Sequence, residues 1–107
     1  MRTQDKELIR KLADCAAACH ACAVACLEEE NVKKMAECIR LDLDCSSSCE
    51  NAIGYVSRGS RYVNEIVKQC SVISKACEEE CRKHDSDHCQ ACADACHACH
   101  QACEAFV

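Results

Sequence analysis

The sequence predicts an all-α protein, an antiparallel up-down four-helix bundle with a cysteine-lined core. Three observations predict this fold. The 107 residues include only two glycines and no proline, so little interrupts a helix. The fifteen cysteines recur at helical spacing. Short polar breaks divide the chain into segments of helix length. The length suits a single domain over residues 1–107.

The first helix is expected over residues 4–29 and contains the stretch CAAACHACAVAC, whose cysteines are separated by steps of four, three and four. At about 100° per residue, these cysteines fall within roughly 60° of arc on one helix face. A polar break over 28–32 follows, with Asn31 as a candidate cap. The second helix is expected over 32–53, where the cysteine steps are seven and four.

Gly54 and Gly59 are expected to bracket the next loop, with Ser60 as the N-cap of a third helix over 60–83. Its cysteines repeat the steps of seven and four. A break near 84–87 offers Asp85 and Ser86 as caps of a fourth helix over 87–106. Because all connections are short, neighbouring helices should run antiparallel.

The fourth helix contains CADACHACHQAC, which repeats the four–three–four register of the first helix. Overlaid on that register, the second and third helices each lack one thiol, at Asp42 and Ser74. The pattern is therefore fourfold, and every helix carries its cysteines on one face toward a common axis.

A face of cysteines can be a core of small hydrophobic residues, because free cysteine buries well. Fifteen inward thiols favour a metal-binding core instead, since leucine or valine would pack better and would not oxidise. Six pairs lie at i,i+4, about 5–6 Å apart at Cβ, too far for a disulfide, which needs about 3.5–4.5 Å. The predicted metal ligands are Cys15, Cys19, Cys22, Cys26, Cys38, Cys45, Cys49, Cys70, Cys77, Cys81, Cys89, Cys92, Cys96, Cys99 and Cys103.

The sulfur-only ligand set favours a soft, low-coordinate ion, and Cu(I) fits that description. Fifteen buried thiolates would carry about fifteen negative charges, which about one Cu(I) per thiolate would neutralise. About three or four tetrahedral Zn²⁺ ions would leave roughly half of this charge uncompensated. Iron–sulfur clusters fit less well, because their cysteines usually lie on loops.

The net charge of −5 argues against a nucleic-acid partner, and no segment is long and apolar enough for a membrane helix. The N-terminal stretch MRTQDKELIR lacks the features of a secretory signal peptide. A cytoplasmic location, where thiols stay reduced, is therefore expected. No arrangement of a nucleophile and a base, and no phosphate loop, indicates an enzyme.

The Cys-x-x-x-Cys helices, the repeated Ala-Cys-His-Ala-Cys and the fourfold organisation resemble the bacterial copper storage protein (Csp) family over essentially the whole chain. The resemblance implies a four-helix bundle that holds many Cu(I) ions between pairs of thiolates, commonly as a homotetramer. It is closer to the cytosolic branch than to the exported one. The implied role is copper storage, homeostasis and detoxification, with a copper chaperone or a copper-requiring enzyme as exchange partner. Asp42 and Ser74 would mark places where the metal array is thinner.

The two ends of the predicted bundle differ in composition. One end collects an apolar plug of Leu8, Leu12, Ile53, Val56, Val63, Ile66, Val67 and Phe106. The opposite end collects Cys26, Cys38, Cys81 and Cys89, with Met35, His84 and His88 nearby. Thioether and imidazole groups are suitable transient copper ligands, so copper is expected to pass in and out at this end. The alternative for the two histidines is a polar loop that caps helices.

Other polar residues are expected to have structural roles. His20 and His97 occupy equivalent repeat positions about 120–130° from the cysteine face, which favours flank or subunit contacts. His100 lies about 70° from the centre of the face and could assist Cys96 or Cys103. The glutamate runs at 28–30 and 78–80 are predicted to be solvated. The run 28–30 lies near the expected copper entry and could attract cations there.

Two alternatives to copper storage remain open at the level of sequence. The first is a zinc or general soft-metal thiolate buffer similar in purpose to metallothionein. The second is a thiol/disulfide redox protein, for which the Cys-x-x-Cys pairs Cys19/Cys22, Cys89/Cys92 and Cys96/Cys99 would serve. Catalytic dithiols usually lie at a helix N-terminus, and only Cys89 is close to one.

Overall fold

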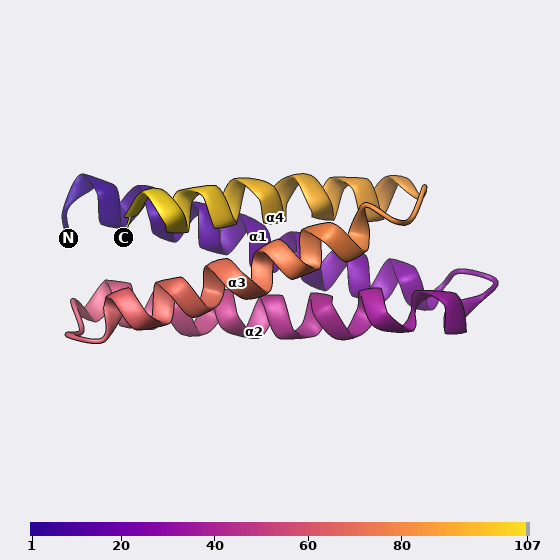
Figure 1. The fold of residues 1–107 in the computed structure, drawn as a ribbon, viewed down its shortest axis with the longest axis horizontal. Helices are drawn as coiled ribbons and strands as arrows, with labels where there is room; N and C mark the ends of the chain where they lie inside the picture. Colours follow the sequence, from indigo (N-terminus) through magenta and orange to yellow (C-terminus); the bar gives the residue numbers. More distant parts are fainter. Residues whose placement is uncertain (107) are drawn as a thin grey trace.

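The computed structural model describes residues 1–106, which form four long α-helices and one short 3₁₀ helix. The α-helices alternate in direction along the bundle, and the connection between α1 and α2 lies at the same end as that between α3 and α4 (Figure 1). Each helix packs against two others: α1 and α3 both contact α2 and α4. The molecule measures 44 × 17 × 17 Å. The bounds are α1 Thr3–Leu27, η1 Val32–Met35, α2 Ala36–Arg58, α3 Val63–Cys81 and α4 Asp87–Phe106.

The end of α2 differs from the prediction. Gly54 does not end the helix, which continues to Arg58 and stops at Gly59. Gly59 has φ 64° and ψ 40°, a left-handed conformation that glycine adopts without a steric penalty. The N–H of Ser60 then donates to the carbonyl of Tyr55 at 3.1 Å, which closes the last turn. Only the second of the two glycines therefore ends the helix.

Three of the predicted caps also differ in the structure. Ser60 is not the N-cap of α3; Tyr62 holds that position, and the Ser60 hydroxyl accepts from its backbone N–H at 3.1 Å. Asn31 does cap, but it caps η1, where its side chain accepts from the N–H of Lys34. The hydroxyl of Ser86 has no hydrogen-bond partner among the described residues, so it does not cap α4.

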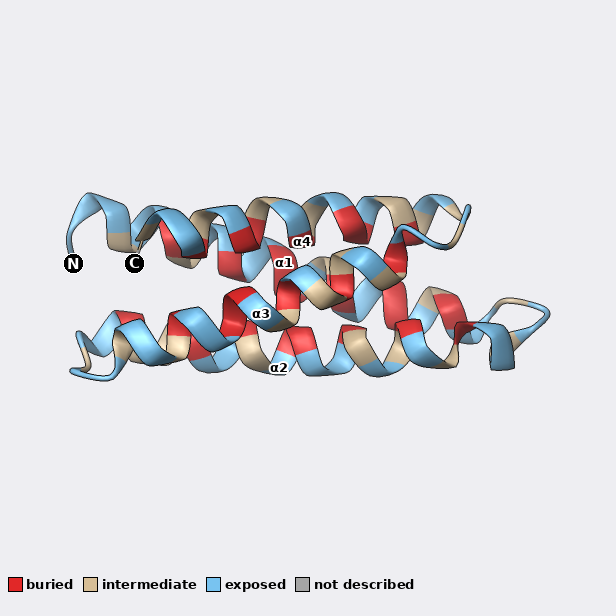
Figure 2. Ribbon diagram, viewed as in Figure 1, coloured by how far each residue is buried: buried red, intermediate tan, exposed pale blue. Residues whose placement is uncertain are grey.

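The buried residues follow one face of each helix and meet along the bundle axis (Figure 2). Leucine and valine fill the core only at the end with the chain termini, where Leu8, Leu12, Val56 and Val67 are buried. This is the predicted apolar plug, and its other members pack against it. Cysteine takes the place of leucine along the rest of the axis. Within residues 1–106, no helix has an apolar stretch long enough to cross a bilayer.

Candidate metal centre

Most sulfurs of the core lie within 4.0 Å of another sulfur. Within the described residues, all fifteen cysteines are buried and free. Neighbouring Sγ atoms lie 3.5 Å apart at Cys38–Cys81, 3.7 Å at Cys15–Cys45 and 3.8 Å at Cys49–Cys70. The helices thus place thiols against one another from one end of the cysteine core to the other.

These separations suit shared metal ions. With sulfur–metal bonds of about 2.3 Å, two sulfurs on one ion lie about 3.8 Å apart in a tetrahedron and at most about 4.6 Å apart. Of the i,i+4 pairs, Cys22–Cys26 is 3.8 Å apart and Cys92–Cys96 is 4.0 Å apart at Sγ. Most of the short sulfur contacts in the described chain join different helices. Metal ions would therefore link helices as well as turns of one helix.

Several sulfurs belong to more than one candidate metal site. Cys19 and Cys96 occur together in a group with Cys15 and Cys45, and again in a group with Cys77 and Cys92. Cys22 occurs in groups with Cys26 and His88, and with Asp42. Such shared sulfurs suit thiolates that bridge metal ions in a multinuclear cluster. They suit less well a set of separate sites in which each ion has its own ligands.

Asp42 lies at the centre of the thiol network. Its side chain is fully buried, and one carboxyl oxygen is 3.3 Å from the sulfurs of both Cys77 and Cys92. The other oxygen is 3.9 Å from the sulfur of Cys38. Burial, with the neighbouring Cys92 thiolate, raises the pKa of Asp42 to about 10, so the carboxyl is protonated at neutral pH without metal.

Asp42 was expected to mark a place where the metal array is thinner, and its carboxyl oxygens lie among the sulfurs at that place. The sequence signal was available: an acid on the inward face of a helix is rare unless it has partners. Ser74, at the other missing position, is also fully buried. Its hydroxyl donates to the carbonyl of Cys70 at 2.8 Å and therefore turns back to its own helix.

The mouth is our name for the bundle end with Cys26, Cys38, Cys81, Cys89, Met35, His84 and His88. His88 is half-buried there, and its Nδ1 lies 3.6–3.9 Å from three sulfurs, those of Cys89, Cys22 and Cys26. Its Nε2 donates to Glu29 at 3.1 Å. In a neutral ring this hydrogen bond places the proton on Nε2, so that the Nδ1 lone pair faces the thiols, as in carboxylate–histidine–metal arrangements.

The other two mouth residues are placed differently. The Nε2 atom of His84 lies 3.0 Å from Glu80, and none of its hydrogen bonds reaches a sulfur in the described chain. Met35 is buried in the core cluster. Both residues line a pocket of about 250 Å³, together with Glu29, Lys34, Lys83, Asp85 and Ser86. Glu29, which lines this pocket, is also the carboxylate that contacts His88.

Burial raises the pKa of the Cys26 and Cys89 thiols at the mouth. Both are neutral thiols at pH 7 in the metal-free protein. A metal ion binds the thiolate, so each ion that binds there releases protons, and binding weakens as the pH falls.

The histidines outside the mouth do not face the thiols. His20 and His97 are exposed on the flank as predicted, paired with Glu50 and Glu78. His100 is buried, but its Nε2 lies 2.8 Å from Glu78, so its expected help to Cys96 or Cys103 is not seen. The run 78–80 is not fully solvated either, because Glu78 and Glu80 have side chains 16% and 13% exposed.

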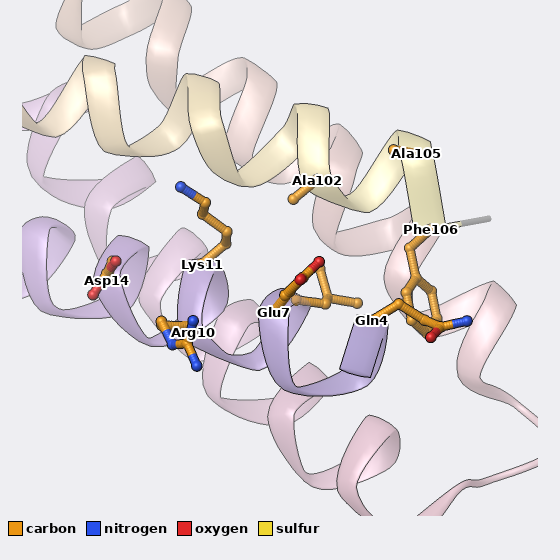
Figure 3. Close-up of a pocket in the computed structure, with 9 residues that line it drawn as sticks. Gln4, Glu7, Arg10, Lys11, Asp14, Ala102, Ala105 and Phe106 are labelled. Carbon is orange, nitrogen blue, oxygen red and sulfur yellow. The ribbon is translucent and has the colours of Figure 1, made fainter. Parts of the chain in front are cut away.

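A larger pocket of about 380 Å³ lies outside the core, between the start of α1 and the end of α4 (Figure 3). Glu7, Lys11 and Phe106 line it, and none of its lining residues is a cysteine, histidine or methionine. This pocket lacks soft metal ligands, so the candidate metal site is the closed thiol core rather than this surface pocket.

The fold and the thiol network together define a class of proteins, helical bundles whose core is built for many soft metal ions. The chain belongs to the copper storage protein family, whose sequence profile matches residues 1–107. It is 41% identical over 93 residues to the uncharacterized cysteine-rich protein YhjQ of Bacillus subtilis, covering 87% of this chain and 86% of that protein.

Two solved structures show the same fold. The Cu(I)-bound copper storage protein BsCsp3 is 40% identical, with a TM-score of 0.92 over 96% of this chain and 97% of that one. A cytosolic copper storage protein from Streptomyces lividans, with five coppers loaded, is 36% identical, with a TM-score of 0.93 over 96% and 91%. The predicted family and fold are thereby confirmed.

Proposed function

We propose that this protein stores and buffers Cu(I) in the cytoplasm, without catalysis, by reversible coordination to its core thiols. The observation that carries the proposal is the core of fifteen buried free cysteines, most of which have a neighbouring sulfur 3.5–4.0 Å away. The family supports Cu(I) as the ion, and the relative from Streptomyces lividans is described as cytosolic. A deep thiolate store serves both copper detoxification and copper supply.

The proposed ligands are the fifteen cysteines, with Asp42 as an additional oxygen donor. Met35, His84 and His88 are proposed to pass copper between solvent and the core. The contacts of His88 Nδ1 with three sulfurs support this route most directly. A copper chaperone or a copper-requiring enzyme would exchange ions at the mouth. We also propose a homotetramer, which would cover exposed apolar residues such as Val24, Leu27 and Val72.

Anaerobic titration of the reduced protein with Cu(I) and with Zn²⁺, each against a competing chelator, tests the function. We expect tight uptake of about one Cu(I) per thiolate, because soft sulfur ligands prefer Cu(I). Saturation at about three or four Zn²⁺ with little copper uptake would overturn the proposal.

Replacement of Cys15, Cys45 and Cys96 by serine provides a matched variant for this titration. Serine fits a buried position of the repeat, as Ser74 does in α3. The variant should fold and lose copper capacity roughly in proportion to the thiols removed. A capacity equal to that of the unaltered chain would show that copper binds elsewhere.

Zinc buffering is the second candidate, and one observation favours it. Four sulfurs from Cys15, Cys19, Cys45 and Cys96 lie within 4.8 Å of one another, which suits tetrahedral zinc. The redox alternative has less support. No short sulfur contact joins the two members of Cys19/Cys22, Cys89/Cys92 or Cys96/Cys99 in the described residues, so these pairs are not poised to form disulfides.

A further inference from the structure

A second group of metal-binding side chains lies outside the thiol core, where α3 packs against α4. His97 and His100 stand one helical turn apart on α4, and both rings are directed at one carboxylate on α3. His97 Nδ1 is 3.2 Å from Oε1 and 3.0 Å from Oε2 of Glu78, and His100 Nε2 is 2.8 Å from Oε1. The two rings are nearly perpendicular, with centroids 5.1 Å apart, so they approach the Glu78 carboxylate from different directions.

We propose that His97, His100 and Glu78 form a surface site for one borderline divalent cation such as Zn²⁺. Two imidazoles and one carboxylate are a ligand set that zinc uses in proteins when a water completes its coordination. Bond lengths of about 2.0–2.1 Å place the ligand atoms of a tetrahedral ion about 3.3–3.4 Å apart. The nitrogen–oxygen distances of 2.8–3.2 Å between the two rings and the Glu78 carboxylate therefore differ from these values by about 0.1–0.6 Å.

An unpartnered buried nitrogen supports the site independently. His100 Nδ1 is buried and has no hydrogen-bond partner among the described residues, although Glu104 Oε1 is 3.4 Å away. When Nε2 binds a cation, the ring proton must reside on Nδ1, where it can donate to Glu104. This is the carboxylate–histidine–metal arrangement that orients metal-bound imidazoles. The occupied site would thus give this nitrogen a partner.

The surroundings allow exchange with solvent but moderate the affinity. The His97 side chain is 46% exposed, so a hydrated ion can reach the site from its side. The Arg82 guanidinium lies 3.6 Å from Glu78 Oε2 and repels a cation. Asp94, 2.8 Å from Arg82, partly offsets this charge. The ligands are nitrogen and oxygen, so the site prefers a harder ion than the thiolates do.

The test is a Zn²⁺ titration of the protein whose thiols are already filled with Cu(I), compared with variants. The loaded chain should bind one further Zn²⁺, and His97→Ala and Glu78→Gln should each weaken that binding strongly. Glu104→Gln, which alters only the outer hydrogen bond, should weaken it about ten-fold. His20→Ala is the matched control: His20 occupies the equivalent repeat position on α1, and its ring hydrogen bond among the described residues is to Glu50, so its loss should leave binding unchanged.

The site-specific readout is the set of imidazole ¹⁵N chemical shifts, which does not require copper in the core. Zn²⁺ should shift the ring nitrogens of His97 and His100 and leave those of His20 unmoved, whether or not the thiols hold Cu(I). Absence of these shifts, or equal Zn²⁺ affinity in His97→Ala and the unaltered chain, would overturn the proposal. Failure of the copper-storage proposal would appear separately, as a low Cu(I) capacity.

Discussion

Asp42 combines a charged group with complete burial, and its surroundings decide its protonation. The unfolded chain would ionise this carboxyl near its ordinary pKa of 3.8, whereas the folded protein holds the pKa at about 10. Folding therefore takes up a proton between these two pH values. The folded protein loses stability as the pH rises through this window.

Asp42→Asn removes the titration and keeps the shape of the side chain. At pH 5 the metal-free variant and the parent should have the most similar free energies of unfolding. At pH 8 the parent should be less stable than the variant. The gap should widen by up to about 1.4 kcal/mol per pH unit. Chemical denaturation of the reduced proteins at both pH values measures it. Asp44→Asn, an exposed change on the same helix, is the control, and identical pH dependence in all three would contradict the assigned pKa.

His88 and His84 show that residue type alone does not define a ligand. Both were predicted at the mouth, and both lie there. Of the two, only His88 has a ring nitrogen, Nδ1, near three sulfurs. Its other ring nitrogen, Nε2, is hydrogen-bonded to the carboxylate of Glu29. The difference arises from side-chain direction, which the order of residues in a loop does not reveal.

At the scale of elements, helix ends were the least predictable feature. Gly54 lies inside α2, and Gly59 ends it, although both looked like loop residues in the sequence. The helix continues past Gly54 because Val56 is buried and packs with the apolar plug, which outweighs the weak helix propensity of one glycine. The predicted α4 matches the observed bounds, because its cysteine register runs uninterrupted.

Replacement of each glycine by alanine should have opposite effects. Gly54→Ala should stabilise the protein by about 0.5–1 kcal/mol, because alanine loses less backbone entropy in a helix. Its Cβ would meet only the flexible end of Arg58 at 3.1 Å. Gly59→Ala should destabilise by about 1–2 kcal/mol, because a side chain strains the left-handed backbone. Denaturant unfolding of both variants provides the comparison, and the same sign at both positions would refute this assignment of the helix end.

At the scale of the whole molecule, the bundle is closed at one end and polar at the other. Leucine and valine fill the end with the chain termini, whereas cysteine, histidine and methionine gather at the mouth. The thiols between them are buried, so an ion has to cross one of these ends. A hydrated cation crosses polar and ligating groups more readily than a packed apolar plug.

Combined replacement of Met35 by leucine and of His84 and His88 by alanine should slow Cu(I) loading about ten-fold, because transient ligands are lost. The final capacity should remain nearly intact, since the core thiols are unchanged. Stopped-flow loading from a Cu(I)–chelator complex measures the rate, and equilibrium titration measures the capacity. His20→Ala with His97→Ala is the matched control, because both histidines are exposed and lie away from the mouth. Equal rates in all three proteins would argue against this route.

The sequence by itself determined the helical class, the four cysteine-bearing faces and the difference between the two ends. Helical periodicity places every residue at an angle about its own helix axis, and the cysteine register repeats clearly enough to define that angle on all four helices. The same rule placed Asp42 and Ser74 on inward faces, where both are buried.

Only the tertiary structure decided which groups meet across helices. Contacts between helices depend on their relative register and on rotamers, and the angle about one axis carries no information on either. The carboxyl of Asp42 therefore points into the thiols while the hydroxyl of Ser74 turns back to its helix. For the same reason, His97 and His100 meet Glu78 of α3, nineteen and twenty-two residues away in the sequence.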